Sequence, residues 1–354
     1  MSAGTPFAAL EPLEPLMDAC VHCGFCLPVC PSYLLLGQET DSPRGRIYTM
    51  RAGVDERVPL SSTVVKHFDT CLGCMACATA CPSGVHYAPL IERTREIIAT
   101  HHERPAGERW FRRLLFATLP YASRLRALAV PMRVGRWVAQ APGVSRLLPA
   151  AIRRALLLAP AAPLRDAFIE TPVLTPARGD ARLKVGLLTG CVQRAMFGRV
   201  NQATARVLAA EGCDVHAPRA QGCCGALALH AGETAQARAF AQRLIETFEA
   251  SPVDVIAVNA AGCGSAMKDY TALFADDPAW AERSARFASR VKDVSEILVG
   301  LGDSRAPRRP LAARVAYHDA CHLAHAQGIR QPPRTLIASI PGVTLVPVAE
   351  SEIC

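Results

Sequence analysis

The sequence of 354 residues has no long apolar run. Its longest apolar stretch, from Ala155 to Leu164, covers ten residues and is interrupted by proline, whereas a helix that crosses a bilayer needs about 20 apolar residues. The amino-terminal stretch Met1–Pro6 also lacks the basic segment and apolar core of a secretory signal peptide. These absences argue against a membrane-spanning helix and against export.

Two more absences narrow the chemistry. No G-x-G-x-x-G sequence follows a predicted strand, so the fingerprint of a dinucleotide-binding fold is missing. Lysine is absent between Arg104 and Arg165, a window with twelve arginines and a single acidic residue, Glu108. This window carries a net charge of +11 in a chain whose total is +8, so the basic character belongs to one segment.

Cysteine, by contrast, is plentiful: the chain has 15, and eight of them form two runs with the same spacing, C-x2-C-x2-C-x3-C-P. This spacing is typical of [4Fe–4S] clusters, and the fourth cysteine of each run ligates the other cluster when two are present. We therefore predict two [4Fe–4S] clusters with crossed ligation. Cys20, Cys23, Cys26 and Cys81 would hold cluster 1, and Cys71, Cys74, Cys77 and Cys30 would hold cluster 2.

Zinc and disulfides are the alternatives for these eight cysteines. Zinc usually takes its four ligands as two separated pairs, which two identical four-cysteine runs fit poorly. Cluster ligands must be reduced thiols, so we expect a cytoplasmic protein. Forty residues separate Cys30 from Cys71, and the apolar spacing over residues 43–66 is closer to a helix than to a strand. An all-helical two-cluster domain is therefore favoured over a compact β-type ferredoxin.

We expect an α+β multidomain chain with four regions. They are an N-terminal all-helical two-cluster ferredoxin domain (1–102), a basic helical segment and linker (103–180), a cysteine-rich α/β domain (181–310), and the start of a second cysteine-rich repeat (311–354). Within the first region, residues 32–36 are expected to form a helical turn packed on a cluster. In the second region, five prolines are expected to cut the chain into short helices: Pro105, Pro120, Pro131, Pro142 and Pro149.

The basic window 104–165 has two interpretations. Its arginines can simply be the solvated faces of helices packed between domains. Alternatively, the arginines interleaved with Trp110, Phe111 and Trp137 form an amphipathic surface that docks on anionic lipid or on an acidic partner. Nucleic acid is disfavoured because no recognition module accompanies the charge.

From residue 183 onward, predicted strands alternate with predicted helices. Strands are expected at 183–188, 214–216 and 253–259, and helices at 200–210 and 226–250, which indicates parallel βα units. An internal repeat emerges on a shift of 130 residues, which aligns Val185 with Val315, Cys191 with Cys321, and Gly212 with Gly342. Residues 311–354 therefore begin a second copy.

A second set of cysteines accompanies this α/β pattern: Cys191, the pair Cys223-Cys224 before Gly225, and Cys263. Each follows a predicted strand or lies in a glycine-rich turn, so a parallel sheet would bring them to one edge. Buried apolar cysteines are the alternative, which suits Cys213 in its strand. The site could hold a further iron–sulfur cluster, zinc, or a redox-active thiol pair.

In the second repeat, Cys321 and Cys354 would begin a matching site, which this sequence leaves incomplete. His318, Asp319 and His322 flank Cys321 and are candidates to orient or tune a ligand. We expect the chain to be truncated at its C-terminus, because a further cysteine would fall roughly forty residues beyond Cys354 by the same 130-residue shift.

These strings resemble a known family. The cysteine runs, together with Asp41-Ser-Pro-Arg-Gly-Arg-Ile-Tyr48 between them, are similar to the iron–sulfur subunit of glycolate oxidase (glycolate dehydrogenase). The Cys223-Cys224-Gly225 set resembles the cysteine-rich (CCG) domain shared with heterodisulfide reductases, lactate-utilisation proteins and the anaerobic glycerol-3-phosphate dehydrogenase subunit. One departure stands out, because Ala266 occupies the position where heterodisulfide-reductase-type sites place a second cysteine after Cys263.

The resemblance implies an electron-transfer subunit of an oxidoreductase, with no substrate chemistry on this chain. FAD-binding partner subunits would oxidise glycolate to glyoxylate, and electrons would pass through the clusters to a membrane acceptor such as a quinone. The protein would then be cytoplasmic or peripheral on the inner face of the plasma membrane. A related lactate, glycerol-3-phosphate or heterodisulfide system is the alternative.

Two further hypotheses remain open at this point. One is a self-sufficient reductase that acts on disulfides at the Cys223-Cys224 pair. The other is a zinc-stabilised interaction module without a redox role, which iron and zinc analysis would distinguish from an electron carrier.

Overall fold

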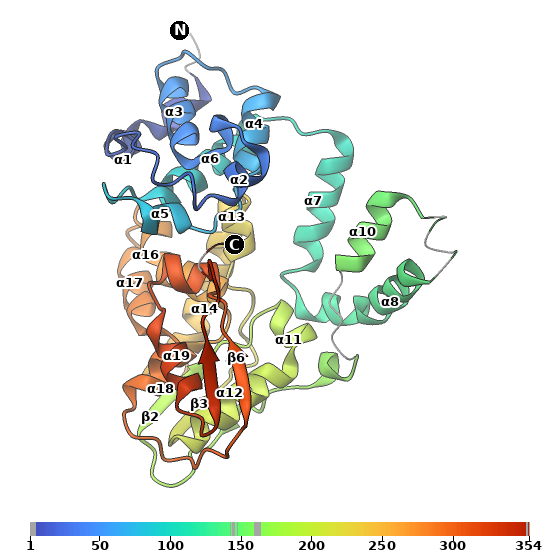
Figure 1. Cartoon of the computed structure of the whole chain (residues 1–354), viewed down its shortest axis with the longest axis vertical. Coiled ribbons are helices and arrows are strands. Elements are labelled where there is room, and N and C mark those ends of the chain that lie inside the picture. The colour runs from blue at the N-terminus through green and yellow to red at the C-terminus, as the bar shows by residue number, and fades with distance from the viewer. Residues whose placement is uncertain are drawn as a thin grey trace.

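The computed structural model describes residues 5–141, 143, 146, 148–158, 164–351 and 353 (Figure 1). Cys354 lies outside the described residues, and with it half of the predicted second-repeat site. Pro142 lies outside them as well. Among the described residues, no helix is both long enough and apolar enough to cross a membrane.

The N-terminal region is helical throughout, which confirms that part of the predicted fold class. Its elements are η1 (Pro6–Leu13), α1 (Glu14–Asp18), α2 (Pro31–Leu36), η2 (Glu39–Asp41), α3 (Pro43–Val54), α4 (Ser62–Asp69), α5 (Ala76–Ala80) and α6 (Tyr87–His101). Phe7, Phe68 and Leu90 are fully buried in a single core beneath the cysteine loops. The loops are thus mounted on a packed helical base.

Helix α2 is a helical turn as expected, but it does not pack its leucines on the cysteine loops. Leu34 is 55% exposed and Leu35 is 84% exposed. The helix is only six residues long and ends at Gly37, which adopts a left-handed conformation with φ of 66°. Only Ser32 of this helix is buried. The helical turn therefore meets the thiols predicted for cluster 2 through Ser32, whose hydroxyl lies 3.3 Å from Cys30 Sγ, and not through its leucines.

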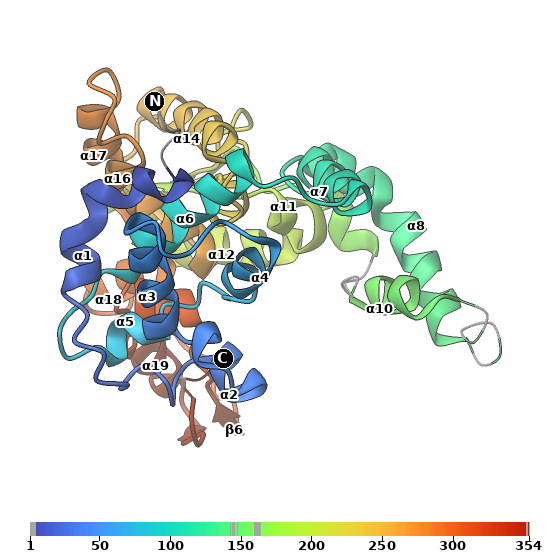
Figure 2. The same ribbon diagram turned by 90° about the horizontal axis from the view of Figure 1, so that it is seen from above.

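The basic segment forms an arm that extends to one side of the molecule (Figure 2). It comprises α7 (Ala106–Thr118), α8 (Ala122–Gln140), α10 (Ala150–Leu158) and the short η3 (Leu164–Phe168). Pro131 lies inside α8, so the prediction that this proline cuts the chain was wrong. Pro105 and Pro149 directly precede α7 and α10, and Pro120 lies between α7 and α8, as expected of helix boundaries.

A mostly parallel sheet follows. It is built from β1 (Leu174–Thr175), β2 (Leu183–Leu187), β3 (Cys213–His216), β4 (Val255–Val258) and β5 (Val291–Asp293), in the order β1-β3-β2-β4-β5, with only β1 antiparallel. The accompanying helices are α11 (Val192–Met196), α12 (Gly198–Ala210), α13 (Ala226–His230), α14 (Thr234–Glu249), α15 (Ala261–Lys268), α16 (Tyr270–Leu273), α17 (Ala281–Arg290) and α18 (Val294–Gly300). Separate apolar cores, one around Ile256 and one around Leu187, place buried side chains on both faces of the sheet, as parallel sheets require.

The helix predicted over residues 226–250 is interrupted. It ends after His230 and restarts at Thr234, with Gly232 between the two pieces at a φ of 82°. A Cβ atom at Gly232 would lie 2.2 Å from the carbonyl oxygen of Arg95 on α6. The break therefore serves a close approach between the α/β region and the N-terminal helices, which helical periodicity alone could not reveal.

The internal repeat is present in the fold. The second copy consists of β6 (Ala313–Ala316), the π-helical turn η4 (His322–Ala326), α19 (Gln331–Ala338) and β7 (Val343–Val346). Strand β6 pairs with β7 in the same parallel register as β2 with β3, so that Ala313–Val343 repeats Leu183–Cys213 at a shift of 130. Gly212 and Gly342 share a left-handed backbone, with φ of 89° and 83°.

Candidate metal centres

The two cysteine loops have the same backbone conformation. On a shift of 51 residues, His22 and Gly24 of the first loop align with Gly73 and Met75 of the second, and all four have a positive φ of 53°, 87°, 65° and 62°. Residues with a side chain seldom adopt this conformation. Both loops adopt this conformation at the same two positions, although the glycine occupies the second position in the first loop and the first position in the second loop. The two loops therefore follow the same backbone path.

The thiols predicted for cluster 1 lie close enough to influence one another. Burial raises the pKa of the Cys20 thiol, a backbone hydrogen bond from His22 lowers it, and the nearby thiols of Cys81 and Cys23 raise it further. Burial also raises the pKa of Cys26, with a smaller contribution from Cys20. Cys81, from the other run, is therefore a neighbour of the first loop.

The thiols predicted for cluster 2 line one cavity, in which Cys30 of the first run joins Cys71, Cys74 and Cys77 of the second. Burial raises the pKa of Cys74 to about 11, and Cys71 and Cys30 add to this shift. Burial also raises the pKa of Cys77, which is influenced by Cys71, Cys74 and Cys30, and by Cys26 of the other set. The two sets are therefore adjacent to each other.

The donor atoms of each set suit a cube of iron and sulfide, which takes four cysteine thiolates. Among the described residues, no three His, Cys, Asp or Glu side chains are placed to hold a single metal ion. The thiolates around a four-iron cluster stand farther apart than the ligands of one zinc ion, because the cube separates them. Four neighbouring thiols in each set supply the donors that a [4Fe–4S] cluster needs.

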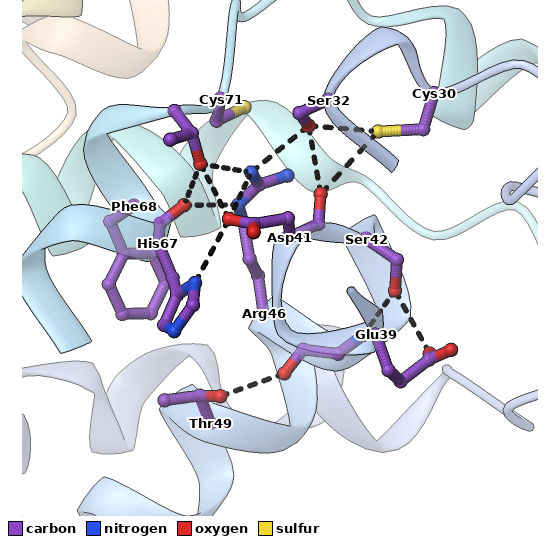
Figure 3. A network of polar contacts seen from close by, with 12 residues as sticks. Cys30, Ser32, Glu39, Asp41, Ser42, Arg46, Thr49, His67, Phe68 and Cys71 are labelled. Carbon is purple, nitrogen blue, oxygen red and sulfur yellow. Dashed lines mark hydrogen bonds and ion pairs between the residues drawn. The ribbon is translucent and has the colours of Figure 1, made fainter. Parts of the chain in front are cut away.

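A buried polar network lies beside the four cysteines predicted for cluster 2, the second set (Figure 3). Arg46 on α3 is only 1% exposed and donates hydrogen bonds to the His67 carbonyl at 2.7 Å, to Thr70 Oγ1 at 2.9 Å and to Ser32 Oγ at 3.1 Å. Ser32 Oγ lies 3.3 Å from Cys30 Sγ. Asp41 completes the network, with its carboxylate 3.7 Å from Arg46 and accepting a hydrogen bond from Thr70 at 2.7 Å.

The four cysteines predicted for cluster 1, the first set, have a neighbouring arginine of their own, which is more exposed. Arg44 donates a hydrogen bond from Nη1 to the carbonyl oxygen of His22 at 2.9 Å, which ties α3 to the first loop. Its guanidinium also pairs with Glu39 at 2.6 and 3.2 Å. Its side chain is 28% exposed, so water reaches this pair.

The segment Asp41–Tyr48 thus lies between the two loops. Two of its residues, Ser42 and Gly45, are small because of the backbone around them. Ser42 is the N-cap of α3 and accepts a hydrogen bond from the Gly45 amide at 3.0 Å. A Cβ atom at Gly45 would lie 1.9 Å from the Glu39 carbonyl oxygen. From the sequence, this segment carried only the family resemblance, so Arg44 and Arg46 were missed as neighbours of the thiols. Their spacing of two residues beside a predicted helix start was the available signal.

The four cysteines of the α/β region gather at the carboxyl ends of the three central strands. Cys191 follows β2, the pair Cys223-Cys224 follows β3, and Cys263 lies in the first turn of α15 after β4. The sulfur atoms of Cys191 and Cys223 are 3.5 Å apart. Cys213 lies in β3 and is fully buried in the apolar core, away from this cluster of thiols.

These four thiols form a chain of hydrogen bonds, from Cys191 to Cys223, Cys224 and Cys263. The hydrogen bond to Cys223, together with burial, raises the pKa of Cys191. The bond from Cys191 lowers the pKa of Cys223, but the bond to Cys224 and burial outweigh it and raise that pKa to about 12. The bond with Cys223 likewise lowers the pKa of Cys224, while the bond with Cys263 and burial raise it well above its ordinary value. Tyr270 holds this turn by a hydrogen bond to the Cys224 carbonyl at 2.6 Å. Four linked thiols are suited to thiol–disulfide exchange, and they supply the donor chemistry of a thiolate metal site although their described positions do not close around one ion.

The start of the second repeat lies between these sites. Cys321 directly precedes η4, a π-helical turn of the kind often found at functional sites. Its thiol influences the pKa of Cys74 of the second set. His325 hydrogen-bonds with Thr79 of α5 at 3.0 Å, and Gln327 donates to the Ala261 carbonyl on α15 at 2.9 Å. Helix η4 therefore bridges the ferredoxin loops and the cysteine-rich site.

Of the three residues expected to flank Cys321 and tune its site, one contacts the thiol. His322 Nδ1 lies 3.8 Å from Cys321 Sγ. Asp319 is instead paired with Arg334 at 2.6 and 2.8 Å. His318 Nε2 lies 3.1 Å from the carbonyl oxygen of Ile353. Asp319 and His318 thus have structural partners.

Comparisons with known proteins agree with this division of the chain. A family model described as a 4Fe-4S dicluster domain matches residues 16–85, and a model described as a cysteine-rich domain matches residues 185–268 and 315–354. The chain is 37% identical over 345 residues to the "Probable glycolate oxidase iron-sulfur subunit" of Bacillus subtilis, covering 95% of this chain and 77% of that one. It is 33% identical over 354 residues to the "Glycolate oxidase iron-sulfur subunit" of Escherichia coli, covering 98% and 80%.

More distant relatives match about half of the chain. The "Lactate utilization protein A" of an Exiguobacterium strain is 32% identical over 170 residues, which is 48% of this chain and 69% of that protein. No solved structure matches the chain. The matches show an iron–sulfur protein in which a 4Fe-4S dicluster domain precedes a cysteine-rich domain.

Proposed function

We propose a function from one premise: this chain belongs to the family of glycolate oxidase iron–sulfur subunits. It would act as the electron-transfer subunit of a glycolate-oxidising complex. An FAD-binding partner would remove two electrons and two protons from glycolate to give glyoxylate, and this chain would carry the electrons onward to a membrane acceptor such as a quinone. The observation that supports this proposal is the convergence of four thiols from both runs on one cavity.

The residues that would hold the clusters follow from that arrangement. Cys20, Cys23, Cys26 and Cys81 would hold cluster 1, and Cys30, Cys71, Cys74 and Cys77 would hold cluster 2. A [4Fe–4S] cluster, when bound, accepts and releases one electron at a time. The positive-φ residues of each loop fold its backbone around three thiols, and the helices below keep the loops in place.

The order of sites gives the chain the form of a relay. Cys77 of the second set is close enough to influence Cys26 of the first, and Cys74 is likewise a neighbour of Cys321 in the second repeat. The second set therefore lies between the first set and the cysteine-rich region. We propose that Cys191, Cys223, Cys224 and Cys263 hold a further metal centre at the end of this line.

Exposed apolar side chains around the cysteine loops favour docking of the flavin-bearing partner there. Val21 and Phe25 of the first loop are 68% and 63% exposed, and Leu72 of the second loop is 61% exposed. Leu35 on the neighbouring α2 is the most exposed of all at 84%. Exposed apolar groups beside a redox site suit a protein partner, because a short distance between cofactors needs close contact. Leu35→Glu should abolish the complex while leaving the iron content unchanged.

The arm formed by α7, α8 and α10 supports the proposal of peripheral membrane contact. Trp110 and Trp137 are 65% and 70% exposed, among the arginines of these helices. Some of those arginines have structural partners: Arg112 pairs with Glu233 and Arg126 pairs with Glu170. Exposed tryptophan beside cationic groups is suited to the surface of anionic lipid. Trp110→Ala/Trp137→Ala should lower binding to vesicles of mixed anionic and zwitterionic phospholipid.

Crossed ligation is tested with double variants after anaerobic reconstitution with iron and sulfide. Two cubes require about eight irons. If the sets are crossed, Cys20→Ser/Cys81→Ser should disable one cluster and leave about four irons in the ferredoxin domain, whereas Cys20→Ser/Cys30→Ser should disable both. Ligation within each run predicts the reverse pattern. Zinc bound without iron would refute the electron-transfer function itself.

A second candidate is an electron-transfer subunit for lactate, favoured by the half-length match to lactate utilization proteins. The two candidates differ in the partner and its substrate. Reconstitution with an FAD-binding glycolate oxidase subunit should give cluster reduction on addition of glycolate. Reduction by lactate alone would support the second candidate.

A further inference from the structure

We propose that Arg44 and Arg46 set the reduction potentials of the two clusters separately, Arg44 acting on cluster 1 and Arg46 on cluster 2. This inference rests on the proposed ligation by the two cysteine sets. It assigns a role to the segment Asp41–Tyr48, which holds both arginines at the start of one helix. The Arg44 side chain reaches the first loop at His22, whereas the Arg46 side chain reaches Thr70, directly before Cys71 of the second loop.

Arg46 is the buried member of this pair. Its side chain is 1% exposed, and it lines the same cavity as Cys30, Cys71, Cys74 and Cys77. It reaches the thiols through Ser32, whose hydroxyl lies 3.1 Å from Arg46 Nη2 and 3.3 Å from Cys30 Sγ. Its guanidinium is thus fixed beside the second set by hydrogen bonds from three directions.

Arg44 is the exposed member. It touches the first loop through the His22 carbonyl at 2.9 Å, and its Nη1 atom would lie 2.8 Å from a Cβ atom at Gly24. Its charge is closely paired with Glu39, at 2.6 Å, and both groups are open to water. The counter-charge of Arg46 is farther away, since the Asp41 carboxylate lies at 3.7 Å and is bound by Thr70 at 2.7 Å and by His67 at 3.0 Å.

Elementary electrostatics then separates the two clusters. Reduction adds a negative charge to a cluster, so a fixed positive charge nearby favours the reduced state. That effect is larger where the charge is buried, because water and salt screen it less. Arg46 should therefore raise the potential of its cluster more than Arg44 does, and electrons should settle on cluster 2, the one nearer to the cysteine-rich region.

The test is a redox titration of the reconstituted chain followed by electron paramagnetic resonance. Arg46→Met should lower the potential of one reduction step by roughly 59 mV, which is a tenfold change for one electron. Arg46→Lys, which keeps the charge and loses the forked hydrogen bonds, should shift that step much less. Arg44→Gln should move the other step, and by a smaller amount.

Several outcomes would overturn the inference: an unchanged potential in Arg46→Met, an equal shift in Arg46→Lys, or movement of the same step by both arginine variants. If Arg46→Met fails to fold, Asp41→Asn tests the same idea with the opposite sign. It removes a negative charge and should raise the potential of the Arg46 step, and an unchanged or lower potential refutes the proposal. Failure of the proposed ligation would show differently, as missing iron and missing signals in the unmodified chain.

Discussion

The ferredoxin loops and the cysteine-rich site gather their thiols in different ways. Each loop carries three cysteines within seven residues and, in the proposed crossed ligation, would take only the fourth ligand from the other run. The cysteine-rich site draws its four thiols from three separate strand ends, spread from Cys191 to Cys263. The ferredoxin thiols lie beside cationic side chains, Arg44 and Arg46. Those of the cysteine-rich site hydrogen-bond chiefly with one another.

This difference shows how each site depends on its surroundings. A loop that carries its own ligands needs only a firm base, and its chemistry is adjusted by a neighbouring helix. A site at strand ends depends on the sheet, because its ligands meet only when the strands are in register. Cys224 is itself part of the apolar core around Phe248, so the site and the core of the α/β region cannot be separated.

The largest effect should come from Cys224→Ser. If the proposed metal centre forms at the cysteine-rich site, this variant should lose that metal while keeping about eight irons in the ferredoxin domain. Cys213→Ser is the matched control, since Cys213 is equally buried but lies in β3, outside the site. Iron and sulfide analysis of both variants checks this. Equal metal content in the two variants would mean that Cys224 has only a packing role.

A large effect on stability should come from Gly45→Ala, at the start of α3. The added Cβ atom would lie 1.9 Å from a backbone carbonyl oxygen, which cannot move aside without shifting the segment between the loops. We expect a loss of about 3 kcal/mol in the free energy of unfolding. Urea titration followed by circular dichroism measures it.

Gly107→Ala provides the control for that substitution. Gly107 lies in α7, and a Cβ atom added there would meet no neighbouring atom of the described residues within 4 Å. This variant should be neutral or slightly more stable, by up to about 1 kcal/mol, because alanine favours the helix. A loss in Gly107→Ala as large as that in Gly45→Ala would contradict the steric explanation.

Features set by short sequence spacings could be predicted from the sequence, whereas features set by contacts between distant residues could not. The cysteine runs and the 130-residue repeat could be predicted because the information lies in short spacings and in one constant shift. The break at Gly232 could not, because its reason is the Arg95 carbonyl of a helix more than a hundred residues earlier. Pro131 inside α8 and the exposed Leu35 also depend on surroundings that local patterns do not encode.

A smaller effect on stability is expected from Asp269, which lies near the contact between the N-terminal helices and the α/β region. Burial, with the negative charge of Glu92 on α6, raises the pKa of this carboxyl from 3.8 to about 6. Between these values the folded state keeps a proton that the unfolded state has released. Stability should therefore fall as the pH rises from about 4 to about 6.

Asp269→Asn should remove this part of the pH dependence. The variant should gain on the order of 2 kcal/mol over the natural chain at pH 7, after allowance for partial exposure, and show little difference at pH 4. Urea unfolding at several pH values measures the gap. A gap that is constant across this range would show that the carboxyl is not protonated in the folded protein.

The smallest effects should come from two helix N-caps, one in each region, and they test whether the regions unfold together. Ser61 caps α4 by accepting a hydrogen bond from the Val64 amide at 3.3 Å, and Asp293 caps α18 by accepting from the Ser295 amide at 2.8 Å. Replacing either by alanine should cost about 1 kcal/mol. If the regions are separate domains, calorimetry should resolve two transitions, with Ser61→Ala lowering only one and Asp293→Ala only the other. A single transition lowered equally by both variants would show that the contacts of Gly232 and η4 make the two regions one cooperative unit.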